Sequence, residues 1–154
     1  MLPALMNQDF SELLRVFNDH SVDYLVVGAH ALAAHGHVRA TKDLDVWIRP
    51  EIENARRTLT ALKSYGAPLQ DLTERDLATP GTVFQVGIPP LRIDILTKID
   101  GVEFAAAWPD RWQAKFGNES ATVISLKHLI ANKKASGRPQ DLVDVQTIQD
   151  ALSN

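Results

Sequence analysis

One short apolar segment constrains the fold more than any other part of the sequence: Tyr24-Leu-Val-Val-Gly28. A segment of this length that is apolar on both faces is typical of a central strand covered by helices on both sides of its sheet. The residues after it, 29–35, are rich in alanine and stop at Gly36, which predicts a short helix with a glycine end. A buried strand that turns directly into a helix indicates an α/β fold.

Further helices and strands follow from the periodicity of the apolar residues. Helical spacing predicts helices over 8–19, 51–65, 126–136 and 139–152, and alternation or short apolar runs predict strands over 42–49, 82–87, 91–96 and 121–124. The stretch after Pro68 is expected to be rich in loops, and the segment around Trp108 and Trp112 to be irregular. We therefore expect one domain over residues 1–154 of the α/β (α+β) class, with a short mixed β-sheet flanked by helices and two C-terminal helices packed alongside.

Composition limits the chemistry that the chain can perform. Its 154 residues are 45% hydrophobic and 23% charged, and a chain of this size buries about 70% of its unfolded surface, enough for one core. Cysteine is absent, which excludes a disulfide scaffold, a thiolate zinc site, a thiol nucleophile and an iron–sulfur cluster. The net charge of −3 disfavours non-specific coating of DNA, and the sequence holds no P-loop or nucleophile-elbow motif.

The sequence predicts a cytoplasmic protein with no membrane partner. The longest nearly apolar stretch, residues 24–34, is too short to span a bilayer and contains Gly28 and His30. The N-terminus lacks the cationic start and the long apolar run of a secretory signal.

Three aspartates lie where two predicted strands can bring them together. Asp43 and Asp45 are two residues apart on one strand, so their carboxylates leave the same face with about 7 Å between the backbones. Asp94, between Ile93 and Ile95, joins them if the strands are neighbours. Carboxylates held this close repel one another unless Mg²⁺ or Mn²⁺ neutralises them, and two such ions about 3.5–4 Å apart serve phosphoryl or nucleotidyl transfer. The alternative is a solvated sheet face, on which Asp-x-Asp is also common.

The turn before the short helix is a candidate phosphate site. Gly28 and Ala29 place free backbone N–H groups at the start of a helix, and such groups favour anions. Arg39, Thr41 and Lys42 follow this turn and add two positive charges before the aspartate pair.

These motifs together resemble the nucleotidyltransferase superfamily of DNA polymerase beta. Its pattern is a glycine followed by Gly or Ser, a spacer, Asp-x-Asp/Glu and a distant third Asp, which Gly28, the segment 43–45 and Asp94 match. The chain looks most like the small bacterial minimal nucleotidyltransferases, including those of abortive-infection and toxin–antitoxin systems. The tail, 133–144, also looks like their closing segment. Ala29 departs from the pattern, because it lacks the hydroxyl that a serine would offer to a phosphate.

The resemblance, which covers about residues 24–152, implies an enzyme that transfers a nucleoside monophosphate from a nucleoside triphosphate (NTP) to an acceptor hydroxyl and releases pyrophosphate. Asp43 and Asp45 would bind two Mg²⁺ or Mn²⁺ ions, and Asp94 would hold the ion at the acceptor hydroxyl and accept its proton. The residues expected to bind the nucleotide and its phosphates are Gly28, Ala29, Arg39, Thr41, Lys42, Lys133 and Arg138. The acceptor (a tRNA, a protein side chain or a small molecule), the base, and a cognate toxin or antitoxin protein stay open.

Two other functions fit the same residues. Ala29 favours a binding module that keeps the fold but turns over weakly, such as an antitoxin or a regulatory partner. An enzyme that hydrolyses a phosphodiester with two metal ions would also use the three carboxylates.

Helical spacing places Lys133 on the buried stripe of residues 126–130. We expect its ammonium to point into a pocket beneath the Gly28 turn and to meet a triphosphate there, with Arg138 in support. The alternative is that Lys133 extends along its helix while Arg138 pairs with Asp141 as a structural clamp.

Overall fold

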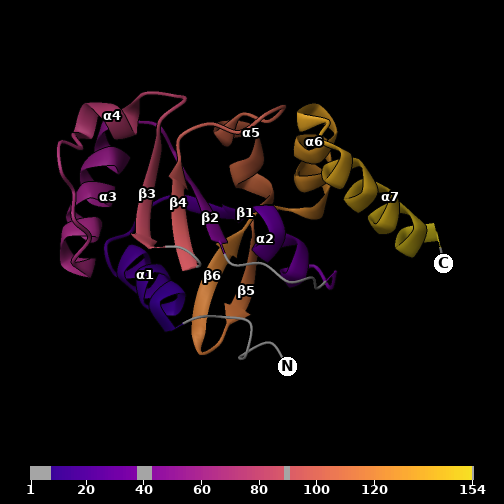
Figure 1. The fold of residues 1–154 in the computed structure, drawn as a ribbon, viewed down its shortest axis with the longest axis horizontal. Helices are drawn as coiled ribbons and strands as arrows, with labels where there is room; N and C mark the ends of the chain where they lie inside the picture. The colour runs from indigo at the N-terminus through magenta and orange to yellow at the C-terminus, as the bar shows by residue number, and fades with distance from the viewer. Residues whose placement is uncertain (1–7, 38–42, 89–90, 154) are drawn as a thin grey trace.

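The computed structural model describes residues 8–37, 43–88 and 91–153, and its centre is a six-stranded sheet in the order β3-β4-β2-β1-β6-β5 (Figure 1). The strands are β1 (Tyr24–Val27), β2 (Asp43–Ile48), β3 (Val83–Ile88), β4 (Leu91–Leu96), β5 (Trp112–Phe116) and β6 (Glu119–Val123). β2 runs parallel to β4 and antiparallel to β1, and β1 runs parallel to β6. The outer pairs β3–β4 and β5–β6 are antiparallel. The predicted short mixed sheet is therefore confirmed.

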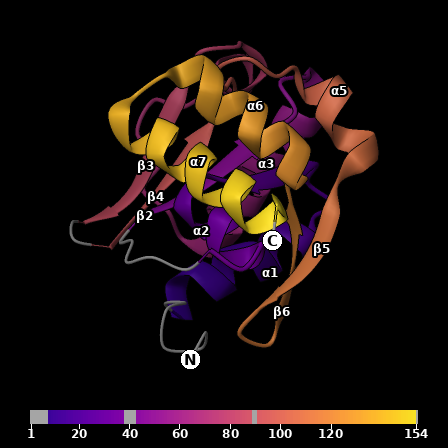
Figure 2. The same cartoon turned by 90° about the vertical axis from the view of Figure 1, so that its right-hand side faces the viewer.

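Helices lie on both sides of this sheet. They are α1 (Gln8–Asp19), α2 (Gly28–Ala34), α3 (Ile52–Tyr65), α4 (Glu74–Ala78), α5 (Phe104–Ala107), the 3₁₀ turn η2 (Trp108–Asp110), α6 (Leu126–Ser136) and α7 (Pro139–Ser153). α1, α3 and α4 gather on one side, and the C-terminal pair α6 and α7 lies on the other (Figures 1 and 2). Among the helices of the described ranges, none is long and apolar enough to cross a membrane.

The core forms where the apolar periodicity predicts it. α1 buries a stripe whose members, Phe10, Leu13, Leu14 and Phe17, are each at most 2% exposed. All four residues of β1 are buried as well. The segment that is apolar on both faces is thus a central strand, because helices cover it from both sides.

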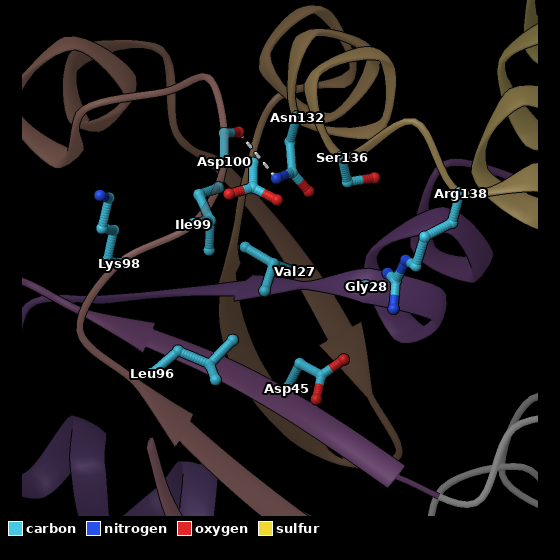
Figure 3. A pocket seen from close by; sticks show the side chains of 10 residues that line it. All are labelled: Val27, Gly28, Asp45, Leu96, Lys98, Ile99, Asp100, Asn132, Ser136 and Arg138. Atoms are coloured by element: carbon cyan, nitrogen blue, oxygen red, sulfur yellow. Dashed lines mark hydrogen bonds between the residues drawn. The ribbon is translucent and has the colours of Figure 1, made fainter. Parts of the chain in front are cut away.

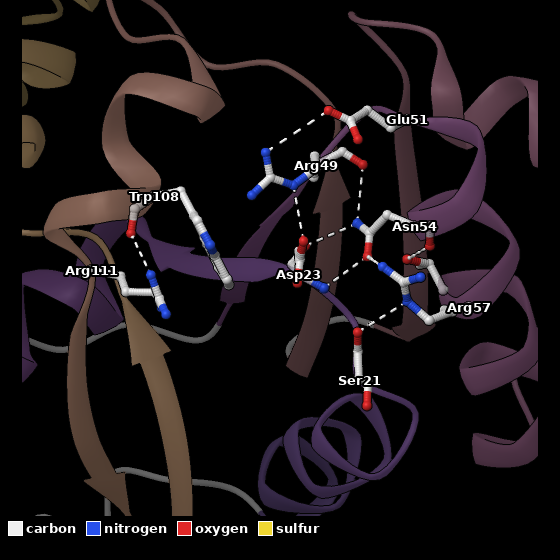
Figure 4. A network of polar contacts seen from close by, with 9 residues as sticks. Ser21, Asp23, Arg49, Glu51, Asn54, Arg57, Trp108 and Arg111 are labelled. Carbon is white, nitrogen blue, oxygen red and sulfur yellow. Dashed lines mark hydrogen bonds and ion pairs between the residues drawn. The ribbon is translucent and has the colours of Figure 1, made fainter.

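A polar network joins the start of β1 to the end of β2 (Figure 4). Arg49 Nε donates to Asp23 Oδ2 over 2.9 Å, and its guanidinium lies 5.3 Å from the ring centre of Trp108. Asn54, in the first turn of α3, donates to the backbone carbonyl of Asp23 and accepts from its backbone N–H. These contacts hold β1 and β2 in register at the end of the strands away from Asp45.

Three elements differ from the sequence-based expectation. α4 is too short to show a helical period, and a capping box between Thr73 and Asp76 stabilises its first turn. β5 contains Trp112, so the prediction of an irregular segment there is wrong, because this segment pairs with β6 as an antiparallel strand. α5 lies in a segment for which no helix was predicted. It places the buried Phe104 edge-on against Trp47 of β2.

Candidate active site

The three predicted aspartates share one face of the sheet. Asp43 and Asp45 alternate along β2, and Asp45 pairs in register with Asp94 on the neighbouring parallel strand β4. Paired residues of adjacent strands point to the same side, so the three carboxylates leave the sheet together. Leu44, between Asp43 and Asp45, and Ile93, directly before Asp94, are buried and point to the opposite face.

The surroundings of Asp45 oppose its ionisation. Burial first, and then the negative charges of Asp94 and Asp43, raise the pKa of Asp45 from 3.8 to about 7, while Arg138 and Arg92 act in the opposite direction. A half-buried carboxyl group beside two others gains free energy by binding either a proton or a cation. The electrostatics of the site therefore favour a positive ligand at Asp45.

Arg92 supplies positive charge to this cluster and was missed by the sequence analysis. Its Nε lies 3.1 Å from Asp94 Oδ1, and its Nη2 lies 3.3 Å from Asp43 Oδ2. Arg92 is two residues before Asp94 on β4 and pairs in register with Asp43. The alternation Arg-Ile-Asp over residues 92–94 was the available signal, because it puts both charged side chains on one face.

The donor set suits a hard cation, although no cation site is preformed in it. Within residues 8–37, 43–88 and 91–153, no three acidic or histidine side chains stand close enough together to hold a metal ion. Carboxylate oxygens are nevertheless the ligands that Mg²⁺ and Mn²⁺ prefer, and a cation would relieve the repulsion at Asp45. Because Arg92 bridges Asp43 Oδ2 and Asp94 Oδ1, a cation that uses these two oxygens must displace the guanidinium. The residues fit a divalent cation on that condition.

The turn between β1 and α2 lies against Asp45. Gly28 has a φ of 69°, a left-handed backbone conformation that favours glycine. A Cβ atom at this position would collide with the Asp45 carboxylate. In the described part of the chain, the N-cap residue Val27 provides no side-chain cap for the first backbone N–H groups of α2. These groups can therefore donate to a ligand that lies beside Asp45.

A pocket of about 320 Å³ opens in front of this turn (Figure 3). Its lining residues are Val27, Gly28, Asp45, Leu96, Lys98, Ile99, Asp100, Asn132, Ser136 and Arg138. The structure thus brings Gly28, Asp45 and Arg138 of the predicted site together. Figure 3 shows the Arg138 side chain reaching from the junction of α6 and α7 toward Gly28.

Four polar residues of the pocket wall were not predicted. Lys98 and Asp100 follow the carboxyl end of β4, and Asn132 and Ser136 are four residues apart on α6. Asn132 Nδ2 donates to the backbone carbonyl of Asp100 over 2.9 Å, which joins α6 to this loop. The i, i+4 spacing on α6 was the available signal, because it places two polar side chains on one helix face.

Lys133 does not point into this pocket. It is buried at 4% exposure, as its helical position predicts, but its ammonium lies 2.9 Å from Asp144 Oδ2 and 3.3 Å from Asp141 Oδ1. Both carboxylates belong to α7, so Lys133 joins the two C-terminal helices. The expectation that the Lys133 ammonium points into the pocket beneath the Gly28 turn is therefore wrong, because the carboxylates of α7 hold it between the two helices.

The remaining predicted residues divide into two groups. Arg39, Thr41 and Lys42 lie outside the described residues. Ala29 is the second residue of α2, directly after Gly28.

The fold is similar to that of a solved protein from Thermotoga maritima whose crystal structure carries the name "putative nucleotidyltransferase". The alignment covers 92% of this chain and 89% of that chain, with a TM-score of 0.57 and 13% sequence identity. At this identity the likeness concerns the fold alone. The chain therefore has a nucleotidyltransferase-like fold, in which helices flank a six-stranded mixed sheet. No protein-family profile and no curated protein sequence matches the chain.

Proposed function

We propose that the protein is a metal-dependent nucleotidyltransferase, which moves a nucleoside monophosphate from an NTP to an acceptor hydroxyl and releases pyrophosphate. The observation that carries this proposal is the register of Asp45 with Asp94, on the sheet face that also presents Asp43 and beside the Gly28 turn. This arrangement offers oxygen ligands for cations next to backbone donors for phosphate, which are the two requirements of the reaction.

The three carboxylates have different roles in the proposed reaction. Asp43, Asp45 and Asp94 would hold two Mg²⁺ or Mn²⁺ ions. Bound there, the ions would lower the pKa of the acceptor hydroxyl and neutralise negative charge on the leaving pyrophosphate. Asp94 is proposed to accept the hydroxyl proton. Arg92 would orient the Asp94 carboxylate until a cation replaces its contact with Asp43.

The pocket in front of the Gly28 turn is proposed to bind the triphosphate. The backbone N–H groups of Gly28 and Ala29 would donate to phosphate oxygens, and Arg138 would add a planar guanidinium that matches a phosphate group. Lys98 and Ser136 line the same pocket and bring an ammonium and a hydroxyl. Charge-assisted donors of this kind stabilise the charge that develops on pyrophosphate as the bond breaks. The proposal also includes Arg39, Thr41 and Lys42 as phosphate-binding residues.

The sequence motifs extend the proposal to a biological setting. Their resemblance to abortive-infection and toxin–antitoxin enzymes suggests a role in such a system, with a cognate toxin or antitoxin protein as partner. The acceptor is then a tRNA, a protein side chain or a small molecule, and the reaction takes place in the cytoplasm, where nucleoside triphosphates are supplied.

A second candidate function is favoured by Arg92. Its guanidinium already pairs with two of the three carboxylates, as a substitute for a cation would. Ala29, which brings no side-chain hydroxyl to the Gly28 turn, favours the same function. Both features fit a module that binds a nucleotide or a partner and turns over weakly.

Product analysis distinguishes these functions. The protein is incubated with each α-labelled NTP, with Mg²⁺ or Mn²⁺ and with an extract of the cells that produce it. Transfer yields pyrophosphate and a labelled acceptor. Hydrolysis of a phosphodiester yields neither of them, and a binding module yields no product.

A further inference from the structure

The carboxylate of Asp141 on α7 links the two C-terminal helices. It accepts hydrogen bonds from Lys133 Nζ over 3.3 Å, from Arg138 Nε over 2.8 Å and from the Ser136 hydroxyl. Burial alone would favour the neutral acid, but the hydrogen bonds from Ser136 and Arg138 and the charge of Lys133 lower the pKa of Asp141. This carboxylate is therefore a fixed anion with donors on several sides.

The rest of the network holds Asp141 in place. Lys133 also donates to Asp144 over 2.9 Å, and Asp144 accepts from Gln140 over 3.0 Å. The side chains of Asp141 and Lys133 are each only 5% exposed. Groups this deeply buried and multiply bonded lose their rotamer freedom, so Asp141 presents its oxygens in one geometry.

Arg138 contrasts with the buried members of the network. Its side chain is 78% exposed, and a long surface side chain of this kind normally samples many rotamers. The bond from Nε to Asp141 restrains it, and Figure 3 shows the guanidinium end directed toward Gly28. Arg138 therefore lines the pocket while its Nε is bonded to the network.

We infer that Asp141 is a positioning residue, which sets the affinity of the pocket for nucleotide phosphates by fixing Arg138 in its binding orientation. This inference rests on the proposed binding of a triphosphate at the Gly28 turn. Without the Asp141 carboxylate, Arg138 keeps its charge but must be ordered by the ligand itself, and the entropy lost in that ordering weakens binding. Lys133 and Asp144 contribute indirectly, because they fix the position of Asp141.

A double-mutant cycle with inorganic triphosphate as the probe tests this inference. Titration calorimetry measures the affinity of the wild type, Arg138→Ala, Asp141→Asn and the double variant. We expect each single substitution to weaken binding, by about tenfold for Arg138→Ala and by a smaller factor for Asp141→Asn. The double variant should bind no more weakly than Arg138→Ala, because Asp141 acts only through Arg138. Losses that multiply in the double variant would overturn the inference.

Two further variants separate positioning from charge and from folding. Asp150→Asn changes the charge of α7 equally at an exposed site, where the carboxylate accepts from Gln146, and should leave triphosphate affinity unchanged. Arg138→Lys keeps the charge at an exposed position, but a single ammonium cannot bond Asp141 and a phosphate with separate nitrogens. Arg138→Lys should therefore bind nearly as weakly as Arg138→Ala, and wild-type affinity in this variant would contradict the inference even if Asp141→Asn did not fold.

The proposed function and the inference fail in different ways. Triphosphate binding with the expected cycle but without transfer would support the positioning role of Asp141 and reject the transferase. Transfer with independent effects of Arg138 and Asp141 would do the reverse. A wild type that does not bind inorganic triphosphate would overturn the inference directly.

Discussion

Asp45 and Asp94 lie directly opposite each other where β2 pairs with β4, and the negative charge of Asp94 helps to hold the pKa of Asp45 near 7. Two carboxylates in register on adjacent strands repel each other in the absence of a cation. The sheet keeps them together because Leu44, Val46, Ile93 and Ile95, which alternate with them, are buried on the other face. Stability of the core thus offsets an unfavourable electrostatic arrangement at the site.

The raised pKa of Asp45 predicts that the contribution of this residue to the stability of the protein falls as the pH rises. Between pH 4 and pH 7 the folded state holds a proton on Asp45 that the unfolded chain releases, since the pKa falls from about 7 to 3.8 on unfolding. The stabilising contribution is therefore complete below pH 4 and is lost as the pH passes through 7, by up to about 4 kcal/mol. Urea unfolding in EDTA at several pH values measures it. The unfolding free energy of the wild type, taken relative to that of Asp45→Asn, should fall across this pH range, and a difference between the two proteins that does not change with pH would be inconsistent with the raised pKa.

Divalent cations should stabilise the folded protein. A bound cation relieves the repulsion among Asp43, Asp45 and Asp94 and binds the unfolded chain poorly, so millimolar Mg²⁺ or Mn²⁺ should raise the melting temperature by roughly 2–6 °C. The increase should be larger at pH 8 than at pH 5, because protons compete for Asp45 at the lower pH. Removal of the metal with EDTA should reverse it. A melting temperature that does not change when the cation is added, at either pH, would count against a metal site.

Substitution of Arg92 by glutamine should strengthen metal binding. The guanidinium bridges Asp43 and Asp94, so its removal frees these carboxylates for a cation and should tighten Mn²⁺ binding by about tenfold. Stability in EDTA should fall by no more than about 1 kcal/mol, because the Arg92 pairs are partly exposed. Titration calorimetry gives the affinity, with Arg56→Gln on the exposed side of α3 as the control. Weaker Mn²⁺ binding in Arg92→Gln would show instead that Arg92 orders the carboxylates for the metal.

Substitution of Lys133 by methionine should lower the free energy of unfolding. It leaves Asp141 and Asp144 without their shared buried cation, and loss of one partner from a buried ion pair costs about 3–5 kcal/mol. The exposed neighbour Lys134 provides the control, since Lys134→Met should change the free energy of unfolding by less than about 0.5 kcal/mol. Equal stability of the two variants in urea unfolding would mean that the buried network contributes nothing to the docking of α7.

The position of the aspartates could be predicted because a strand has a period of two. The spacing of Asp43 and Asp45 already assigns both to one face, and the placement of Asp94 between two isoleucines assigns it to the polar side of its own strand. Only the adjacency of β2 and β4 had to be learned from the structure. The same rule applies to Arg92, which shares the face of Asp94 and was overlooked.

The failure at Lys133 has a different cause. Helical spacing predicts that its stem is buried, and it is, but spacing does not tell which group meets the ammonium at the end of a long side chain. The partners, Asp141 and Asp144, are 8 and 11 residues further along the chain, beyond the turn at Gly137, on a second helix. Their proximity depends on the angle between α6 and α7, which no local pattern specifies. Arg138 takes the place in the pocket that was expected for Lys133.

The most direct measurement of the central claim is label transfer by the wild type and by Asp45→Asn under identical conditions. Each receives α-labelled NTPs, Mn²⁺ or Mg²⁺ and an extract of the cells that produce the protein. The wild type should transfer label to an acceptor and release pyrophosphate in equal amount. Asp45→Asn, which keeps the shape of the side chain beside Gly28, should lose at least about 99% of the transfer. Equal transfer by both proteins, or wild-type protein that transfers no label from any NTP, would contradict the account.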